Sequence, residues 1–199
     1  WTDDELELLV DDFVVAAGLA HDTGYQFVDI KACHGYLLHE CLSARRRPGR
    51  FGGDFDGRTR LLRTIIRQVS ETYPDLRVAV RLSVFDTQPY QPSPDMGQPV
   101  RWDDEVYDDC FSHSPELPTP ESLAESIRLI RCLLALDVMA VNITCGSPYY
   151  NPHIQRPAMF PPSDGYLPPE DPLVGVARQI HAARICKQAV PTMPMVGSG

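Results

Sequence analysis

The sequence predicts an α/β fold, an incomplete (β/α)8 TIM barrel with about four β/α units. Helical and strand patterns alternate four times along the 199 residues, with strands beginning near residues 27, 78, 138 and 194. Parallel strands require long crossover connections, which the intervening helices supply. No internal repeat and no linker divides the chain, so we expect one partial barrel domain over residues 1–199, truncated at both ends.

A first helix is predicted over residues 2–22. Thr2 and Glu5 have the spacing of a capping box, in which each side chain bonds the backbone N–H of the other residue. Apolar residues at helical spacing predict its buried face: Leu6, Leu9, Phe13, Ala16, Ala17 and Ala20. A short apolar run from Phe27 to Ile30 then predicts a buried strand.

A polar turn over residues 33–36 follows this strand, and Gly35 permits a sharp reversal there. A basic, glycine-rich connection over 45–53 leads to a second helix from about 57 to 72. Its predicted buried residues are Leu61, Leu62, Ile65, Ile66 and Val69. The second strand is predicted over 78–83.

Two segments, 86–118 and 144–170, are rich in proline and too long for ordinary connections. For 86–118 we weigh a lid above the barrel mouth against a plain surface excursion. Between the two segments, Thr119-Pro120-Glu121 predicts a helix start and residues 138–143 a third strand. A flavodoxin-like open sheet is the alternative fold, although it seldom needs two connections of this length.

Asp171-Pro172 predicts the start of a fourth helix. Its expected inward residues are Leu173, Val176, Ile180 and Ala183. A fourth strand over 194–199 follows it.

The composition indicates a globular protein with one sizeable core, since 43% of the residues are hydrophobic. Eighteen basic and 27 acidic residues give a net charge of −9, which argues against nucleic acid or an anionic membrane as a partner. No apolar run approaches the roughly 20 residues of a membrane helix, and no signal peptide is seen. Six cysteines without a C-x-x-C pair indicate reduced thiols in a cytoplasmic enzyme.

Residues that can do chemistry follow the predicted strands. Lys31, His34 and Tyr36 come directly after the first strand, and the ligand site of a barrel lies where its strands end. Arg81 stands near the end of the second strand, where it needs an anion or a polar ring edge; a surface carboxylate is the alternative. Gly197-Ser198-Gly199 after the last strand suits phosphate binding. We therefore expect a small-molecule site, although a polar surface loop remains possible for residues 31–36.

The order and spacing of three motifs closely resemble the old yellow enzyme family. They are Asp-Ile-Lys-Ala-Cys-His-Gly-Tyr-Leu-Leu-His-Glu-Cys-Leu-Ser from Asp29, then Arg47 with Arg50-Phe51-Gly52-Gly53 and Arg58-Thr59-Arg60, and then Val80-Arg81-Leu82-Ser83. The family consists of FMN-dependent NADH:flavin oxidoreductases built as (β/α)8 barrels. The resemblance covers essentially the whole chain and places it between the helix before strand four and the end of strand seven. It implies FMN as cofactor, NAD(P)H as reductant and activated alkenes as substrates.

The resemblance also implies roles for single residues. Arg81 matches the arginine at the pyrimidine edge of the flavin, and Tyr36 matches the proton donor. His34 matches one of two residues that hold the substrate carbonyl oxygen. Lys31 stands where the family usually has the other, a histidine. Gly197, Ser198 and Gly199 fall in the phosphate-binding segment.

Several departures from the family pattern indicate a distinct subgroup. A protonated Lys31 still donates to an oxyanion, but with a longer reach and a full charge. Gly57 replaces an asparagine that many members have, and the two long segments differ from the commonest ene-reductases.

Two other functions remain open on the residues alone. Lys31 could form a Schiff base, as in a class I aldolase-like barrel, and would then need no flavin. The chain could also be a non-catalytic barrel fragment. His39 is expected to be a structural histidine, and a homo-oligomer is compatible with the sequence.

Overall fold

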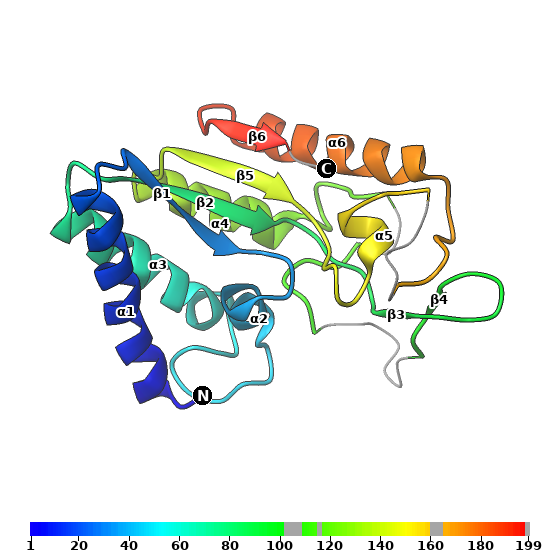
Figure 1. Cartoon of the computed structure of the whole chain (residues 1–199), viewed down its shortest axis with the longest axis horizontal. Helices are drawn as coiled ribbons and strands as arrows, with labels where there is room; N and C mark the ends of the chain where they lie inside the picture. The colour runs from blue at the N-terminus through cyan, green and yellow to red at the C-terminus, as the bar shows by residue number, and fades with distance from the viewer. Residues whose placement is uncertain (102–108, 115–116, 160–164, 198–199) are drawn as a thin grey trace.

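The computed structural model describes residues 1–101, 109–114, 117–159 and 165–197. In this part of the chain, the main sheet has four parallel strands in the order β1-β2-β5-β6 (Figure 1). Their bounds are β1 Phe27–Ala32, β2 Arg77–Ser83, β5 Ala140–Thr144 and β6 Met195–Gly197. The helices are α1 Asp3–Asp22, α2 Leu37–Ser43, α3 Phe55–Thr72, α4 Ala124–Ala135, α5 Pro152–Gln155 and α6 Pro172–Ala189.

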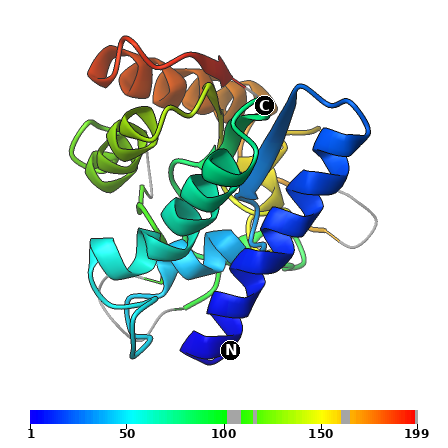
Figure 2. The ribbon, with the colours of Figure 1, turned by 90° about the vertical axis from the view of Figure 1, so that its left-hand side faces the viewer.

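The strand order identifies the architecture as part of a barrel. Each strand of the main sheet lies beside the one that precedes it in the chain, whereas a doubly wound sheet reverses its order at a switch point. Helix α1 packs on α3, α3 on α4 and α4 on α6, which makes a continuous outer layer (Figure 2). The predicted incomplete (β/α)8 barrel is confirmed, and the flavodoxin-like alternative does not fit.

The core lies between the sheet and this helical layer. Ile30, Val80 and Val141 are almost completely buried, one from each of three adjacent strands. Because side chains alternate along a strand, the residues between them face the inside of the barrel. The inner face therefore carries the polar residues of β1, β2 and β5.

All four strands of the main sheet end on the same side of the molecule. Their arrowheads point toward α5 and toward the hairpin of β3 (Tyr90–Gln91) and β4 (Gln98–Pro99) (Figure 1). The described parts of the two long segments thus lie at the carboxyl ends of the strands, where a barrel has its ligand site. The sequence prediction missed the hairpin, because two-residue strands are too short to show a periodic pattern.

Three of the four predicted helix starts are close to those observed. The capping box of α1 is formed: Glu5 N donates to Thr2 Oγ1 at 3.2 Å and Thr2 N donates to Glu5 Oε2 at 2.7 Å. The Asp171 side chain accepts from Leu173 N at 2.8 Å and caps α6 as predicted. Helix α3 begins two residues before the predicted Gly57.

The predicted start of the third helix is wrong. Helix α4 begins at Ala124 and not at Thr119. Thr119 N donates to Ser122 Oγ at 2.9 Å, and Ser122 N donates to Thr119 Oγ1 at 3.2 Å. These reciprocal bonds close a separate turn before the helix, because Ser and Thr side chains compete for backbone groups.

The sequence prediction also missed α2, which begins directly after Tyr36. Its seven residues are too few for a clear helical period, although Leu38 and Leu42 are buried in the core. The basic connection that follows α2 binds α1. Arg47 Nη1 lies 2.6 Å from Asp3 Oδ1, and the Arg50 guanidinium pairs with Glu7.

Ala183 packs against the core as predicted, but the rest of the predicted inward face of α6 is wrong. Leu173 and Ile180 are 75% and 65% exposed, whereas Gly175 and Gln179 are buried. A Cβ on Gly175 would lie 2.7 Å from Pro157 Cγ, and Gln179 Nε2 donates to Ile154 O at 2.8 Å. Close backbone approach and a polar bond, which a hydrophobic pattern does not reveal, orient this helix.

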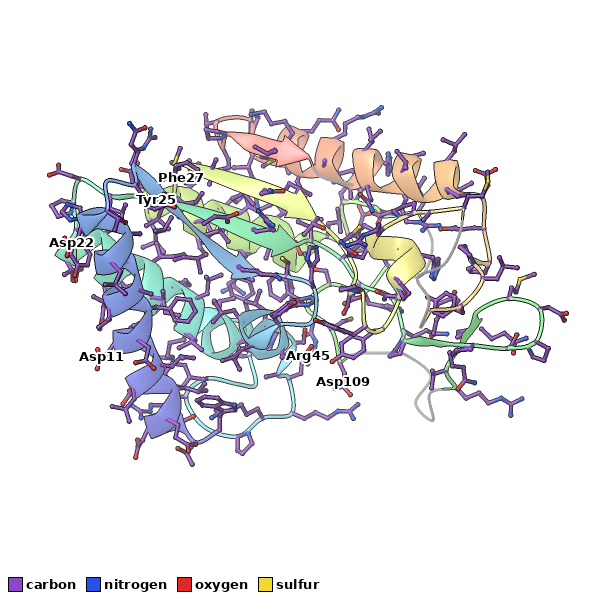
Figure 3. All side chains as sticks on the ribbon, viewed as in Figure 1. Asp11, Asp22, Tyr25, Phe27, Arg45 and Asp109 are labelled. Atoms are coloured by element: carbon purple, nitrogen blue, oxygen red, sulfur yellow. The ribbon has the colours of Figure 1, made fainter. Side chains whose placement is uncertain are left out.

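The start of β1 is not buried as predicted. Phe27 is 48% exposed, and it lies with Tyr25 at the end of β1 opposite to the arrowhead (Figure 3). Strand β1 pairs with β2 on one side only within the described chain, so its first residues lack a second neighbour.

The cysteines agree with the expectation of free thiols. Cys33, Cys41, Cys145 and Cys186 are buried free thiols, and Cys132 is a partly buried one. In the described parts of the chain, no helix is both long and apolar enough to cross a membrane.

Candidate active site

A row of polar residues crosses the inner face of the sheet. Lys31 of β1 is in register with Arg81 of β2, and Arg81 is in register with Asn142 of β5. Residues in register on parallel strands point to the same side of the sheet. Two cations and an amide therefore lie side by side near the carboxyl ends of the strands.

One guanidinium nitrogen of Arg81 has a hydrogen-bond partner, and another has none among the described residues. Its Nη2 donates to Asp29 Oδ2 at 2.9 Å, so the side chain does meet a carboxylate, but on the inner face of the sheet. Its Nε is buried and has no hydrogen-bond partner among the described residues. An unsatisfied buried donor costs about 1–3 kcal/mol. The site thus fits a bound group that presents a hydrogen-bond acceptor to Arg81, as a flavin ring edge does.

Lys31 and Tyr36 are in direct contact. The Lys31 Nζ atom lies 3.3 Å from the centroid of the Tyr36 ring. Tyr36 is the N-cap residue of α2, so the start of this helix fixes its backbone while its side chain stays 44% exposed. A cation on the face of an aromatic ring is stabilised by the ring quadrupole. Strand β1 and the turn after it thereby bring two of the predicted site residues together.

The hydroxyl of Tyr36 has a partner from a distant segment. Its oxygen lies 2.9 Å from the hydroxyl oxygen of Tyr149, which follows β5. The hydrogen bond to Tyr149, helped by the charge of Lys31, lowers the pKa of Tyr36 below its usual range. A phenol with a lowered pKa is a better proton donor, because the phenolate that it leaves is more stable.

His34 occupies a strained turn and is neutral at physiological pH. Its φ of 62° and that of Gly35 at 70° place both residues in the left-handed region. Its Nε2 lies 2.9 Å from Thr144 Oγ1 at the end of β5. Burial, followed by the charges of Lys31 and Arg81, lowers the pKa of His34 to about 4. A neutral imidazole offers one donor and one acceptor at the edge of the row.

A buried polar network lies behind this turn. Gly35 N donates to His39 Nδ1 at 2.8 Å, which leaves the His39 Nε2 proton directed at Asp86 Oδ2, 3.8 Å away. Asn151 Nδ2 donates to Asp86 Oδ1 at 2.5 Å. His39 is therefore a buried structural histidine whose Nδ1 is hydrogen-bonded, in agreement with the expectation from the sequence. The network ties the turn that carries Tyr36 to the segments after β2 and β5.

The two titratable groups of this network affect stability with opposite signs. Burial lowers the pKa of His39 to about 4 and raises that of Asp86 from 3.8 to about 6. As pH falls from about 6.5 to 4, the unfolded state takes up the histidine proton first, so the contribution of His39 to stability is lost. As pH falls from about 6 to 3.8, the folded state takes up the Asp86 proton first, so the contribution of Asp86 increases.

We expect His39→Gln to make stability less sensitive to acid and Asp86→Asn to make it more sensitive. As pH falls from 7 to 5, the titration of His39 lowers the free energy of unfolding by about 2 kcal/mol, and the titration of Asp86 raises it by about 1 kcal/mol. Urea unfolding at pH 7, 6 and 5 measures both slopes. His21→Gln, on the exposed end of α1, is the control. Identical slopes in all four proteins would show that neither buried group titrates as described.

The predicted phosphate segment is described only in part. Gly197 ends β6, and a Cβ placed there would meet no atom of the described residues within 4 Å. Ser198 and Gly199 lie outside the described residues. Gly197 is in register with Ile143 of β5, so it belongs to the same sheet as the polar row but is one strand beyond Asn142.

Sequence reasoning missed three residues of this site. Asp29 precedes Lys31 by two positions, and strand alternation alone would have placed it on the same face. Asn142 could have been found in the same way in the third strand. Tyr149 carried no local signal, because only the fold brings its segment to Tyr36.

Comparison with known proteins identifies the family. Residues 1–113, more than half of the chain, match the NADH:flavin oxidoreductase / NADH oxidase family. The chain belongs to this family. The matched range of the NADH:flavin oxidoreductase family includes Lys31, His34, Tyr36 and Arg81, and it ends before Gly197.

Two curated relatives illustrate the similarity. An NADH:flavin oxidoreductase of Gibberella zeae is 36% identical over 89 residues, which are 43% of this chain and 22% of the relative. A putative 12-oxophytodienoate reductase 2 of Oryza sativa subsp. japonica is 33% identical over 114 residues, which are 56% of this chain and 25% of the relative. The matched stretches thus span about a quarter of these relatives.

Solved structures agree on the fold. The old yellow enzyme homologue from Zymomonas mobilis superimposes with a TM-score of 0.51 at 27% identity, over 74% of this chain and 35% of its own. A 2-naphthoyl-CoA reductase in complex with 2-naphthoyl-CoA superimposes with a TM-score of 0.61 at 21% identity, over 98% of this chain and 23% of its own. The second likeness concerns the fold alone.

Proposed function

We propose that this chain, within a complete barrel, forms the substrate side of an FMN-dependent NAD(P)H oxidoreductase that reduces activated alkenes. The observation that carries the proposal is the grouping of Lys31, Arg81 and Tyr36 at the carboxyl ends of β1 and β2. Family membership supports flavin chemistry, and this grouping supports a substrate with a carbonyl oxygen and an adjacent carbon that needs a proton.

Arg81 and the Gly197–Gly199 segment would hold FMN. The buried Nε of Arg81, which lacks a partner among the described residues, suits the pyrimidine edge of the ring. The end of β6 suits the phosphate, since no described residue comes within 4 Å of a Cβ placed on Gly197. When bound, FMN would supply the hydride that it receives from NAD(P)H.

Lys31, His34 and Tyr36 would act on the substrate. Lys31 and His34 donate hydrogen bonds to the carbonyl oxygen as negative charge develops there, which stabilises the transition state more than the ground state. Tyr36 gives its phenolic proton to the alkene carbon next to the one that receives the hydride. Because His34 is neutral and Lys31 is cationic, the lysine provides most of the charge stabilisation.

Family membership favours this function over the two alternatives. An aldolase-like Lys31 would attack a carbonyl carbon and need no flavin. Borohydride added with a carbonyl substrate would trap such an adduct, and we expect no labelling of Lys31. A non-catalytic fragment would require the barrel to have lost its flavin.

The direct test is an anaerobic visible spectrum of the protein with its barrel complete. We expect a flavin spectrum that bleaches on addition of NADH or NADPH and returns on addition of an enone such as cyclohexenone. A colourless protein that does not take up FMN, or a bleached flavin that no enone reoxidises, would contradict the proposal.

The 199-residue chain alone is expected not to bind FMN tightly. Strands β1 and β6 are the two edges of the described sheet, so one side of the flavin would stay open. Titration of the isolated chain with FMN, followed by flavin fluorescence, measures this. Submicromolar binding with quenched fluorescence would show that four strands suffice.

A further inference from the structure

Tyr149 meets Tyr36 in a defined geometry. Their hydroxyl oxygens are 2.9 Å apart, and the two rings meet edge to face with centroids separated by 5.9 Å. Tyr149 belongs to the segment that follows β5. Tyr149 is 63% exposed, against 44% for Tyr36, so Tyr149 is the more solvent-accessible of the two tyrosines.

The backbone of Tyr149 is held by buried groups. Ser147 and Asn151 are fully buried, and Asn151 Oδ1 accepts from Ser147 N at 2.7 Å. Ser147 Oγ accepts from Tyr149 N at 3.2 Å and donates to His34 O at 3.3 Å. One hydroxyl thus joins the turn that carries Tyr149 to the turn that carries Tyr36.

The two turns also fit closely at Gly35. A Cβ on Gly35 would lie 2.7 Å from Ser147 Oγ and 3.2 Å from the ring of Tyr150. Only glycine allows this approach together with its positive φ. The pairing of the two phenols therefore rests on two docked turns and not only on two exposed side chains.

The direction of the hydrogen bond follows from the chemistry of a phenol. Each hydroxyl has one proton to donate. If Tyr36 directs its proton at a substrate, Tyr149 must be the donor in the bond between them. The charge of Lys31 beside the Tyr36 ring agrees, since it favours negative charge on Tyr36. The same bond raises the pKa of Tyr149 while it lowers that of Tyr36.

We propose that Tyr149 is a positioning residue that acts through Tyr36: it directs the Tyr36 proton toward the substrate and then returns a proton from solvent. This inference rests on the proposed role of Tyr36. In the step, the Tyr36 O–H bond breaks as a C–H bond forms at the carbon next to the one that received the hydride. The proton of Tyr149 then moves to the Tyr36 oxygen, and Tyr149 takes a proton from water.

The experiment compares Tyr149→Phe with Tyr150→Phe in the flavin-loaded protein with its barrel complete. Tyr150 is the matched control, because its hydroxyl donates to Glu40 at 3.4 Å and not to Tyr36. Tyrosine labelled with ¹³C at Cζ reports the titration of each phenol by NMR, and Tyr36→Phe assigns the Tyr36 signal. Stopped-flow absorbance follows flavin reduction and alkene reduction separately.

We expect Tyr149→Phe to raise the pKa of Tyr36 by about one unit and to slow alkene reduction about 10-fold, because a charge-assisted hydrogen bond is lost. Flavin reduction by NAD(P)H should not change, and Tyr150→Phe should behave like the unmodified protein. An unchanged Tyr36 titration in Tyr149→Phe, or equal slowing of both half-reactions, would overturn the inference. The NMR titration does not depend on turnover, so a protein that reduces no alkene would refute the proposed function without affecting this result.

Discussion

Tyr36→Phe is expected to slow alkene reduction by about 100-fold or more while flavin reduction by NAD(P)H stays within a few-fold of the unmodified protein. A positioned general acid typically contributes about 100- to 10,000-fold. The ring of Tyr36 contacts the Lys31 ammonium, and its hydroxyl is hydrogen-bonded to the hydroxyl of Tyr149. Both interactions stabilise the phenolate, so Tyr36 gives up its proton more readily. Phenylalanine keeps the ring under Lys31 and removes only the hydroxyl.

Stopped-flow absorbance separates the two half-reactions in the protein with its barrel complete. Tyr25→Phe is a suitable control, since Tyr25 is 67% exposed and lies at the opposite end of β1 (Figure 3). Equal slowing of both half-reactions would indicate a structural role for Tyr36. No slowing of either would mean that the proton comes from another group or from water.

The second large effect is expected for Arg81→Met. A fixed cation at the pyrimidine edge stabilises the negative charge of a reduced flavin, so its removal should lower the reduction potential. A hydrogen bond to a charged group contributes about 1.5–3 kcal/mol, which corresponds to about 10- to 100-fold in FMN affinity and about 30–60 mV for a two-electron couple. The substitution also leaves Asp29 without its partner at 2.9 Å.

Two variants make the Arg81 result specific. Arg77→Met changes an exposed arginine at the start of the same strand and should leave the flavin unaffected. Asp29→Asn keeps the Arg81 charge and removes the ion pair, so it reports how much of the effect comes from Asp29. FMN titration and redox titration against a dye measure affinity and potential. Full occupancy with an unchanged potential in Arg81→Met would place Arg81 outside the flavin site.

Much of the fold could be predicted from the sequence. The four strands of the main sheet and helices α1, α3 and α6 were located because apolar periodicity, a capping box and an aspartate cap are local signals. Lys31, His34, Tyr36 and Arg81 were found because they stand at the ends of apolar strands. Their proposed roles come from the resemblance to a family, and the experiments above test them.

Only the tertiary structure decided which residues meet. Local pattern predicted the wrong face of α6, because Gly175 packs against Pro157 and Gln179 binds a backbone carbonyl. It also could not pair Arg81 with Asp29 or Tyr36 with Tyr149, since hydrogen bonds between segments 52 and 113 residues apart leave no periodic trace. The sequence by itself determined the elements and the kinds of side chain at the strand ends. The packing of the long segments onto those ends determined the partners of Tyr36 and Arg81, because contacts between distant segments form only when the chain folds.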